Sequence, residues 1–103
     1  IAELKGGIEM KNYFLVSLCK NGILGGGIVV GSNEMTYHTG KVTVPKEIKK
    51  IEMKYQDICD VHVGWLFIFP TILIKLRNEK EYKFIVFNKK RFLNMLREKG
   101  VEI

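Results

Sequence analysis

A carboxylate and an imidazole two positions apart come nearest to a metal-binding pattern in this chain. Asp60 and His62 flank Val61, and residues two apart in a strand lie on the same face. Two ligands do not make a site, and His38, which could supply a third, belongs to a different strand pattern. We therefore interpret both histidines as surface or half-buried residues, and we predict no metal and no cofactor.

A glycine-rich stretch, Gly25 to Gly31, is superficially like a phosphate-binding loop. Such a loop must lead into a helix and usually ends in Gly-Lys-Ser or Gly-Lys-Thr, because helix amides and the lysine hold the phosphates. Here a strand pattern follows and the lysine is missing. We predict a turn and a strand with close backbone approach, and no nucleotide site.

The usual constellations of catalytic residues are missing. We find no Ser-His-Asp order, no paired carboxylates and no Cys-His motif, and most acidic residues alternate with lysines, as on a solvated strand face. The two cysteines, Cys19 and Cys59, lack zinc or redox spacing and lie in strand patterns. We predict that they are reduced, core-side residues of an intracellular protein that has no catalytic residues.

The chain of 103 residues carries a net charge of +6, which favours anionic surfaces without requiring one. The aromatic residues lie beside aliphatic ones at core positions, so no stacking platform for nucleic acid is evident. Lysines break the early apolar runs, and the longest run, Val61 to Ile74, is interrupted by His62 and Pro70, so we predict neither a signal peptide nor a spanning helix. We expect a cytoplasmic protein, either free or peripheral to a membrane.

Three cations occupy the start of a predicted helix. Lys89, Lys90 and Arg91 follow Asn88, a good N-cap residue. Cations in a first turn are unfavourable by roughly 0.3 to 1 kcal/mol each at low salt, because the helix dipole favours negative charge there. We hypothesise a weak phosphate or headgroup site made of these three side chains and the helix amides. The alternative is a solvated, charged turn.

A run before the last hairpin, Gly64 to Pro70, is apolar in both strand phases, with Trp65, Phe67 and Phe69 in one phase and Leu66 and Ile68 in the other. A strand buried on one face should alternate, so something must cover the second face. The cover could be residues 1–10, a second protomer in a dimer, or a membrane interface. If nothing in the chain covers it, we predict a contact surface formed by Trp65, Leu66, Phe67 and Ile68.

Period-two alternation predicts about seven short strands in one domain, 1–103, with residues 1–12 as a lead-in. Gly64 to Pro70 is expected to be a connection, and a helix from about Lys89 to Lys99 should bury Phe92, Leu93 and Leu96 and stop at Gly100. The predicted strands are 14–19, 28–30, 35–39, 51–55, 58–63, 72–77 and 81–87.

Many short antiparallel strands followed by one helix predict a small barrel or sandwich that the helix closes. Four segments carry a family resemblance: Gly27–Met35, Ile51–Ile58, Phe69–Ile74 and Glu81–Phe84. They resemble the GRAM and bacterial pleckstrin-homology-like domains, in which a hairpin ending in Tyr-x-Phe precedes the helix. The resemblance covers about residues 13–100. It implies a mainly β fold, a seven-stranded antiparallel barrel or two packed sheets capped by a C-terminal helix.

The resemblance also implies a non-catalytic scaffold that binds lipid headgroups or protein segments. Phosphoinositide-binding members resemble one another in a Lys-x-Arg cluster at the first hairpin turn, whereas residues 21–27 here contain no basic residue. High-affinity binding at that pocket is therefore not expected. Two functions follow: binding to lipid headgroups or an anionic membrane surface, or a protein-protein interaction or self-association domain, such as a homodimer, with no lipid ligand.

Overall fold

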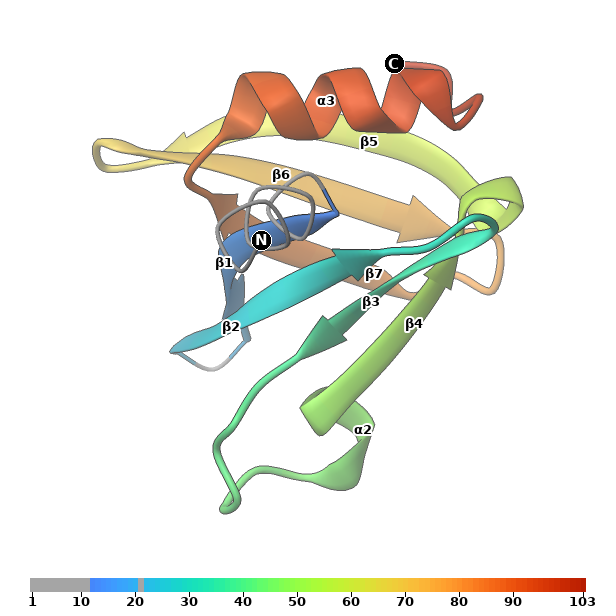
Figure 1. The fold of residues 1–103 in the computed structure, drawn as a ribbon. Coiled ribbons are helices and arrows are strands. Elements are labelled where there is room, and N and C mark those ends of the chain that lie inside the picture. The colour runs from blue at the N-terminus through green and yellow to red at the C-terminus, as the bar shows by residue number, and fades with distance from the viewer. Residues whose placement is uncertain (1–11, 21) are drawn as a thin grey trace, which may run out of the picture.

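The computed structural model describes residues 12–20 and 22–103, which form one curled antiparallel sheet with a helix lying across it (Figure 1). This confirms the predicted mainly β fold of seven strands and a C-terminal helix. Residues 1–11 of the predicted lead-in lie outside the described part. The strands are β1 (Tyr13–Cys19), β2 (Ile23–Val30), β3 (Glu34–His38), β4 (Lys50–Lys54), β5 (Ile58–Leu66), β6 (Phe69–Leu76) and β7 (Glu81–Val86).

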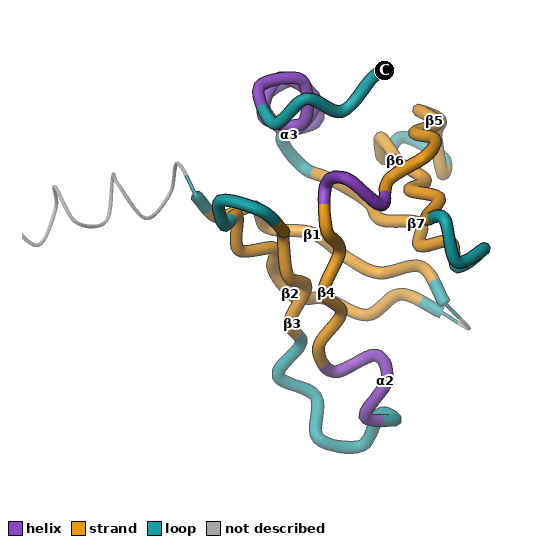
Figure 2. The backbone as a smooth tube through the Cα atoms, turned by 90° about the vertical axis from the view of Figure 1, so that its right-hand side faces the viewer, coloured by secondary structure: helices purple, strands orange, loops and turns teal. Residues whose placement is uncertain are grey.

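Within residues 12–20 and 22–103, three helices accompany the sheet: α2 (Lys46–Lys49), the 3-10 helix η1 (Tyr55–Asp57) and α3 (Lys89–Glu98). The order across the sheet is β4-β3-β2-β1-β7-β6-β5, so β1 joins the two halves through β2 and β7, and β4 and β5 are the edges. Figure 2 shows α3 on one side of this half-barrel and α2 projecting from the opposite side. The single-turn α2, which the sequence pattern does not predict, follows Pro45.

The core lies between the inner face of the sheet and α3. Alternate residues of each strand point inward, and the rings of Phe14 and Phe92 meet edge to face at 5.0 Å between centroids. Phe92 and Leu96 are fully buried as predicted, whereas Leu93 is half-buried and Met95 takes the remaining core position. Each such side chain stabilises the fold by about 1.5 to 3 kcal/mol when fully buried.

Both ends of α3 have the predicted caps. The Asn88 Oδ1 atom accepts a hydrogen bond from the Arg91 amide at 3.4 Å. At the other end Gly100 has a φ of 88°, and the amides of Gly100 and Val101 donate to the carbonyls of Arg97 and Leu96 at 3.0 Å each. Glycine suits this position because it adopts positive φ without a steric penalty. The helix ends one residue earlier than predicted.

Strand β2 is longer than predicted because the glycines belong to it. The strand begins at Ile23, and Gly25, Gly26 and Gly27 all pair with β1. A Cβ atom at Gly26 would clash with the His38 carbonyl and the Tyr37 ring. The Tyr37 hydroxyl donates to the Leu24 carbonyl at 2.8 Å across this gap. The close backbone approach that we predicted is therefore present, and all three glycines belong to the strand.

The segment predicted as a connection, Gly64 to Pro70, is mostly strand. β5 continues to Leu66 and β6 begins at Phe69, so only Phe67 and Ile68 form the turn. The prediction was wrong because continuous apolar residues hide the period-two signal on which strand assignment rests. The outcome is a long hairpin whose closed end carries the whole apolar run.

The cysteines are free, but the prediction that they face the core was wrong. Cys59 is exposed, and Cys19 is half-buried at a position next to the inward-facing Leu18. The ladder between β5 and β6 shifts register between Ile58 and Asp60, which interrupts the alternation at Cys59. Its sulfur lies 3.4 Å from the carbonyl of Lys75.

Candidate functional site

The closed end of the β5–β6 hairpin, Trp65–Phe69, is the candidate site, and we call it the hairpin tip. Large apolar side chains are exposed there: Trp65 is 65% exposed, Phe67 91% and Ile68 79%. Leu66 is half-buried, so the four residues predicted as a contact surface lie together but do not contribute equally. One alternative was that residues 1–10 cover these side chains, and that segment lies outside the described residues.

The turn places a phenylalanine where the backbone favours glycine. Phe67 has a φ of 55° at the first position of a two-residue turn, since Leu66 pairs with Phe69. Two-residue hairpin turns prefer Gly, Asn or Asp at such positions. The left-handed conformation is unfavourable by roughly 1 to 2 kcal/mol for a residue with a Cβ. The side chain is almost fully exposed, so burial does not offset this strain.

The start of α3 lies beside the tip. The Lys89 ammonium stands 5.0 Å from the centroid of the Trp65 ring. Such a cation–π contact at an exposed site contributes about 0.5 to 1 kcal/mol. The sequence placed Lys89 and Trp65 in two separate hypotheses, a headgroup site and an apolar surface. In the structure these two residues are in contact, so the basic helix start and the apolar surface adjoin each other.

The three predicted cations have different surroundings. The Arg91 guanidinium lies 3.9 Å from the centre of the Phe14 ring and donates to the Tyr13 carbonyl at 2.9 Å, which attaches α3 to β1. Lys89 contacts Trp65, and Lys90 is exposed. The Arg91 amide is used by the helix cap. A headgroup site that uses all three side chains stays a prediction, and the structure links Lys89 most directly to the tip.

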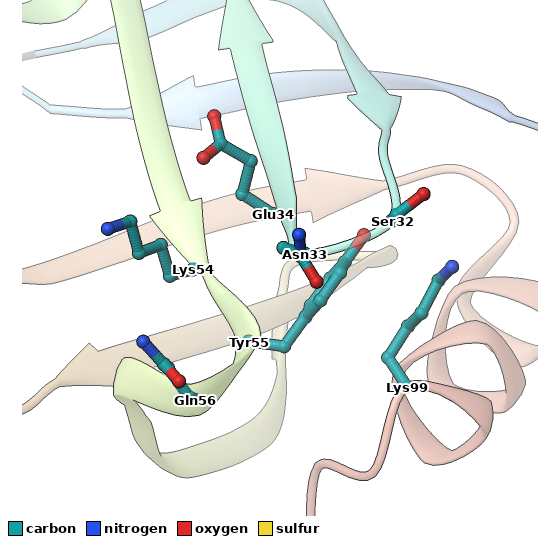
Figure 3. A pocket seen from close by; sticks show the side chains of 7 residues that line it. All are labelled: Ser32, Asn33, Glu34, Lys54, Tyr55, Gln56 and Lys99. Carbon is teal, nitrogen blue, oxygen red and sulfur yellow. The ribbon is translucent and has the colours of Figure 1, made fainter.

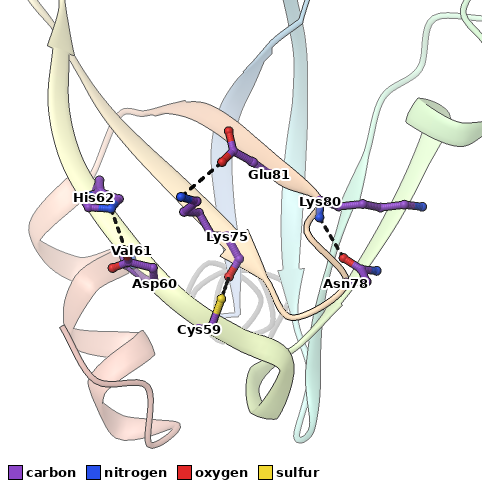
Figure 4. A network of polar contacts seen from close by, with 8 residues as sticks. All are labelled: Cys59, Asp60, Val61, His62, Lys75, Asn78, Lys80 and Glu81. Carbon is purple, nitrogen blue, oxygen red and sulfur yellow. Dashed lines mark hydrogen bonds and ion pairs between the residues drawn. The ribbon is translucent and has the colours of Figure 1, made fainter.

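The opposite end of the same hairpin is polar (Figure 4). The imidazole of His62 lies 2.8 Å from the Asp60 carboxylate, and both side chains are exposed. His38 is on β3, with four strands between it and β5, so it does not join this pair. In the part of the chain that the structure describes, no three His, Cys, Asp or Glu side chains gather as a metal site would require.

A polar hollow of about 600 Å³ lies where the β2–β3 turn and the end of β4 meet the end of α3 (Figure 3). The Tyr55 hydroxyl donates to the Gly31 carbonyl at 2.9 Å, and burial raises the pKa of Tyr55 to about 12. A hydrogen bond to the Glu52 carboxyl raises the pKa of Glu34. Sequence reasoning missed this hollow because its walls come from three segments that are far apart in the sequence, the β2–β3 turn, the junction of β4 with η1, and the end of α3. The lining residues are Ser32, Asn33, Glu34, Lys54, Tyr55, Gln56 and Lys99.

The chain matches no known protein family and no curated protein sequence. Among solved structures it is similar to the C-terminal domain of an unknown protein from Leishmania infantum, with a TM-score of 0.70 and 9% sequence identity, covering 93% of this chain and 96% of that chain. At that identity the similarity concerns the fold alone. Among the described residues, no helix is long and apolar enough to cross a membrane.

Proposed function

We propose that this domain is a non-catalytic binding module of the GRAM or pleckstrin-homology-like type that attaches peripherally to anionic membranes. The observation that carries the proposal is the hairpin tip, where Trp65, Phe67 and Ile68 are exposed together. Tryptophan and phenylalanine partition into the interface between headgroups and acyl chains, where the apolar ring leaves water. A tip of this kind suits shallow insertion.

The charges near the tip support an anionic surface. Lys89 contacts the tip, and Lys90 is the next residue in the sequence. The first turn of α3 contains no acidic residue. Each lysine near an anionic leaflet contributes about 1 kcal/mol of attraction. The two cations that are unfavourable for the helix dipole are therefore favourable for binding a negatively charged surface. The overall charge of +6 acts in the same direction.

The backbone of the turn gives independent support. Phe67 holds a positive φ without being buried, so the residue does not serve the fold at that position. Backbone strain that nothing in the fold offsets is a reason to look for a role in binding. Insertion into a bilayer would bury the side chain and recover free energy that is absent in water.

One other observation favours the alternative, a protein-interaction domain. The edge strand β5 has no lysine or arginine along its nine residues, whereas the other edge, β4, carries Lys50 and Lys54. Lysines on an edge strand discourage pairing with other strands, so β5 is the edge that is open to a partner strand. On this alternative the tip would support protein contact in place of a membrane.

The proposal is tested by co-sedimentation with vesicles of phosphatidylcholine and of an equal mixture with phosphatidylserine. We expect binding to the mixed vesicles only, weakened by salt, with a blue shift of the single tryptophan, Trp65. Phe67→Glu should weaken partition about a hundredfold, because a charge replaces an inserted ring. The matched control is Val42→Glu, since Val42 is 80% exposed in the loop before α2.

Absence of binding to the mixed vesicles, or equal binding by the parent and Phe67→Glu, would overturn the proposal. Light scattering on the same samples addresses the alternative. A stable dimer that leaves vesicles unbound would favour the interaction domain.

A further inference from the structure

Strand β5 has a free edge. It is the last strand of the sheet and pairs only with β6 in the part of the chain that the structure describes. Lysine, proline and bulges are the features that keep an edge strand from pairing with another chain. No lysine, arginine or proline lies in β5, and its register shift is confined to Ile58–Asp60. The edge from Val61 to Leu66 is therefore regular and unprotected.

The tight turn of the hairpin determines which backbone groups of β5 face this edge. Leu66 pairs with Phe69 across a two-residue turn, and the residues that close such a turn bond to each other. Bonded and non-bonded pairs alternate along an antiparallel ladder, so the amide and carbonyl of Trp65 point away from β6. The residue opposite Trp65 is Pro70, which has no amide hydrogen to donate, in agreement with a non-bonded pair.

By the same alternation, Val61 and Val63 direct their amides and carbonyls to the free edge. Their side chains lie on the core face of the sheet, because they are opposite the buried Ile74 and Ile72. Even so, Val63 is 44% exposed and Trp65 65%. Only an extended backbone offers donors and acceptors at the spacing of these three residues. The edge therefore fits a β-strand that has apolar side chains in the same phase.

The same stretch of a second copy has this pattern. In an antiparallel pair about a two-fold axis at Val63, that residue lies opposite its own copy, and Val61 lies opposite the partner's Trp65. Each of these residues directs its backbone groups at the other copy, so every such pair exchanges two hydrogen bonds. The exposed apolar side chains of Val63 and Trp65 are then covered by apolar side chains of the second copy.

The two ends of the regular stretch favour this axis over its neighbours. Moving the axis toward the start of β5 places Trp65 or Val63 opposite the partner's Cys59, where the ladder with β6 shifts register. Moving it toward the turn places Val61 or Val63 opposite the partner's Phe67, which belongs to the turn. Only the axis at Val63 pairs all three residues that face the edge.

Charge does not oppose this pairing. On the outer face His62 lies opposite the partner's Gly64, and Asp60 lies opposite the partner's Leu66, so no like charges meet. The other edge of the sheet differs, because β4 begins and ends with lysine. Pairing of β5 with β4 of another copy would also leave free edges for further copies, whereas pairing of β5 with β5 closes at two.

We propose that two copies of this chain pair through their β5 edges and form one sheet that continues through both. This inference goes beyond the proposed function, because it uses the strand edge and needs no lipid. Antiparallel pairing places the two hairpin tips at opposite ends of the junction, and Trp65 takes part in both surfaces. Pairing therefore competes with insertion of the tip into a bilayer.

Analytical ultracentrifugation of the full chain over a range of concentrations tests the pairing. We expect a dimer for the parent and a dissociation constant at least about tenfold higher for Val63→Lys, because an ammonium group would face its own copy. Val29→Lys is the matched control, since Val29 is also 44% exposed but lies on β2, which pairs on both sides. A parent that is monomeric at every concentration, or a Val63→Lys variant that dimerises as the parent does, would overturn the inference.

A second measurement covers the case in which Val63→Lys does not fold. With Cys19 and Cys59 replaced by serine, Val63→Cys and Val29→Cys each carry one thiol. A short bis-maleimide should join two copies through position 63 and not through position 29, because only position 63 lies opposite itself. Equal cross-linking at both positions, or none at position 63 in a protein that sediments as a dimer, would overturn the inference.

Vesicle binding and pairing are judged separately. A parent that dimerises without binding vesicles overturns the membrane proposal and leaves the pairing, and a monomer that binds vesicles does the reverse. On mixed phosphatidylcholine and phosphatidylserine vesicles, partition of the parent should weaken as protein concentration rises, and that of Val63→Lys should not. Constant partition of a parent that dimerises would overturn the competition.

Discussion

The two ends of the β5–β6 hairpin differ in chemistry although they belong to one pair of strands. At the open end Asp60 contacts His62, and the Lys75 ammonium lies 3.5 Å from the Glu81 carboxylate (Figure 4). At the closed end the five residues of the tip are all apolar, and the Lys89 ammonium lies over the ring of Trp65. One end satisfies its charges within the chain, and the other exposes hydrocarbon.

The pairing of β5 with β6 does not require apolar residues at the closed end. The ladder runs without a break from Val61 opposite Ile74 to Leu66 opposite Phe69, so the backbone geometry is shared. Polar side chains would pair equally well at the closed end, as they do at the open end. The difference therefore concerns what each end contacts, which is water at one end and, on our proposal, lipid at the other.

The largest expected effect comes from removing the core that both ends share. Leu96 belongs to α3 and is fully buried in the core, so Leu96→Ala should lower the free energy of unfolding by about 2 to 5 kcal/mol through lost burial and a cavity. Urea denaturation followed by Trp65 fluorescence measures this change. A denaturation curve that matches the parent would show that α3 does not hold the two ends on one core.

The next effect is near the polar end, at Tyr55, the first residue of the 3-10 helix η1 that leads into β5. Tyr55→Phe should lower the free energy of unfolding by about 0.5 to 1.5 kcal/mol, because the bond to the Gly31 carbonyl is lost. Burial raises the pKa of Tyr55 to about 12. Between pH 10 and about 12 the unfolded chain therefore loses a proton that the folded chain keeps, and stability should fall as pH rises.

Chemical denaturation at several alkaline pH values measures this slope. The Tyr55→Phe variant is the control for the parent protein, because it lacks the ionising hydroxyl. Its stability should therefore decline less as the pH rises. An equal decline in both proteins would assign the alkaline sensitivity to other groups.

At the tip we expect a change of opposite sign. Phe67→Gly should raise the free energy of unfolding by about 0.5 to 1 kcal/mol, since relief of the left-handed strain exceeds the entropy cost of glycine. The same variant should bind anionic vesicles less tightly than the parent. Thermal melting and co-sedimentation on one preparation test both. A destabilised Phe67→Gly would mean that the ring contributes to the fold after all.

The smallest effect belongs to the exposed ion pair at the polar end. Glu81→Gln should change stability by about 0.2 to 1 kcal/mol at low salt and by less at high salt, because both partners are half exposed and screened. Melting at two salt concentrations measures it. Vesicle binding should be unchanged, and a large loss of binding would break the contrast between the two ends.

Local patterns in the sequence determined most of the fold. Alternation at Phe14, Val16 and Leu18 specified an inward phase, and Asn88 and Gly100 specified both ends of α3, because side-chain period and capping chemistry act over a few residues. The same local reasoning failed at Gly64 to Pro70 and at Cys59, where unbroken apolarity and a register shift erase the period. It also identified the apolar run and the basic helix start, each as a separate feature.

Only the tertiary structure decided which of these features meet. Lys89 and Trp65 are distant in sequence and come to 5.0 Å because α3 packs across the sheet beside the β5–β6 hairpin. In the same way, Tyr13 and Val29 lie beside each other on the outward face because β1 pairs with β2 in this register, and no local pattern in the sequence reveals that. The sequence specifies which side chains are present, whereas the pairing of strands and the packing of α3 decide which of them become neighbours on the surface.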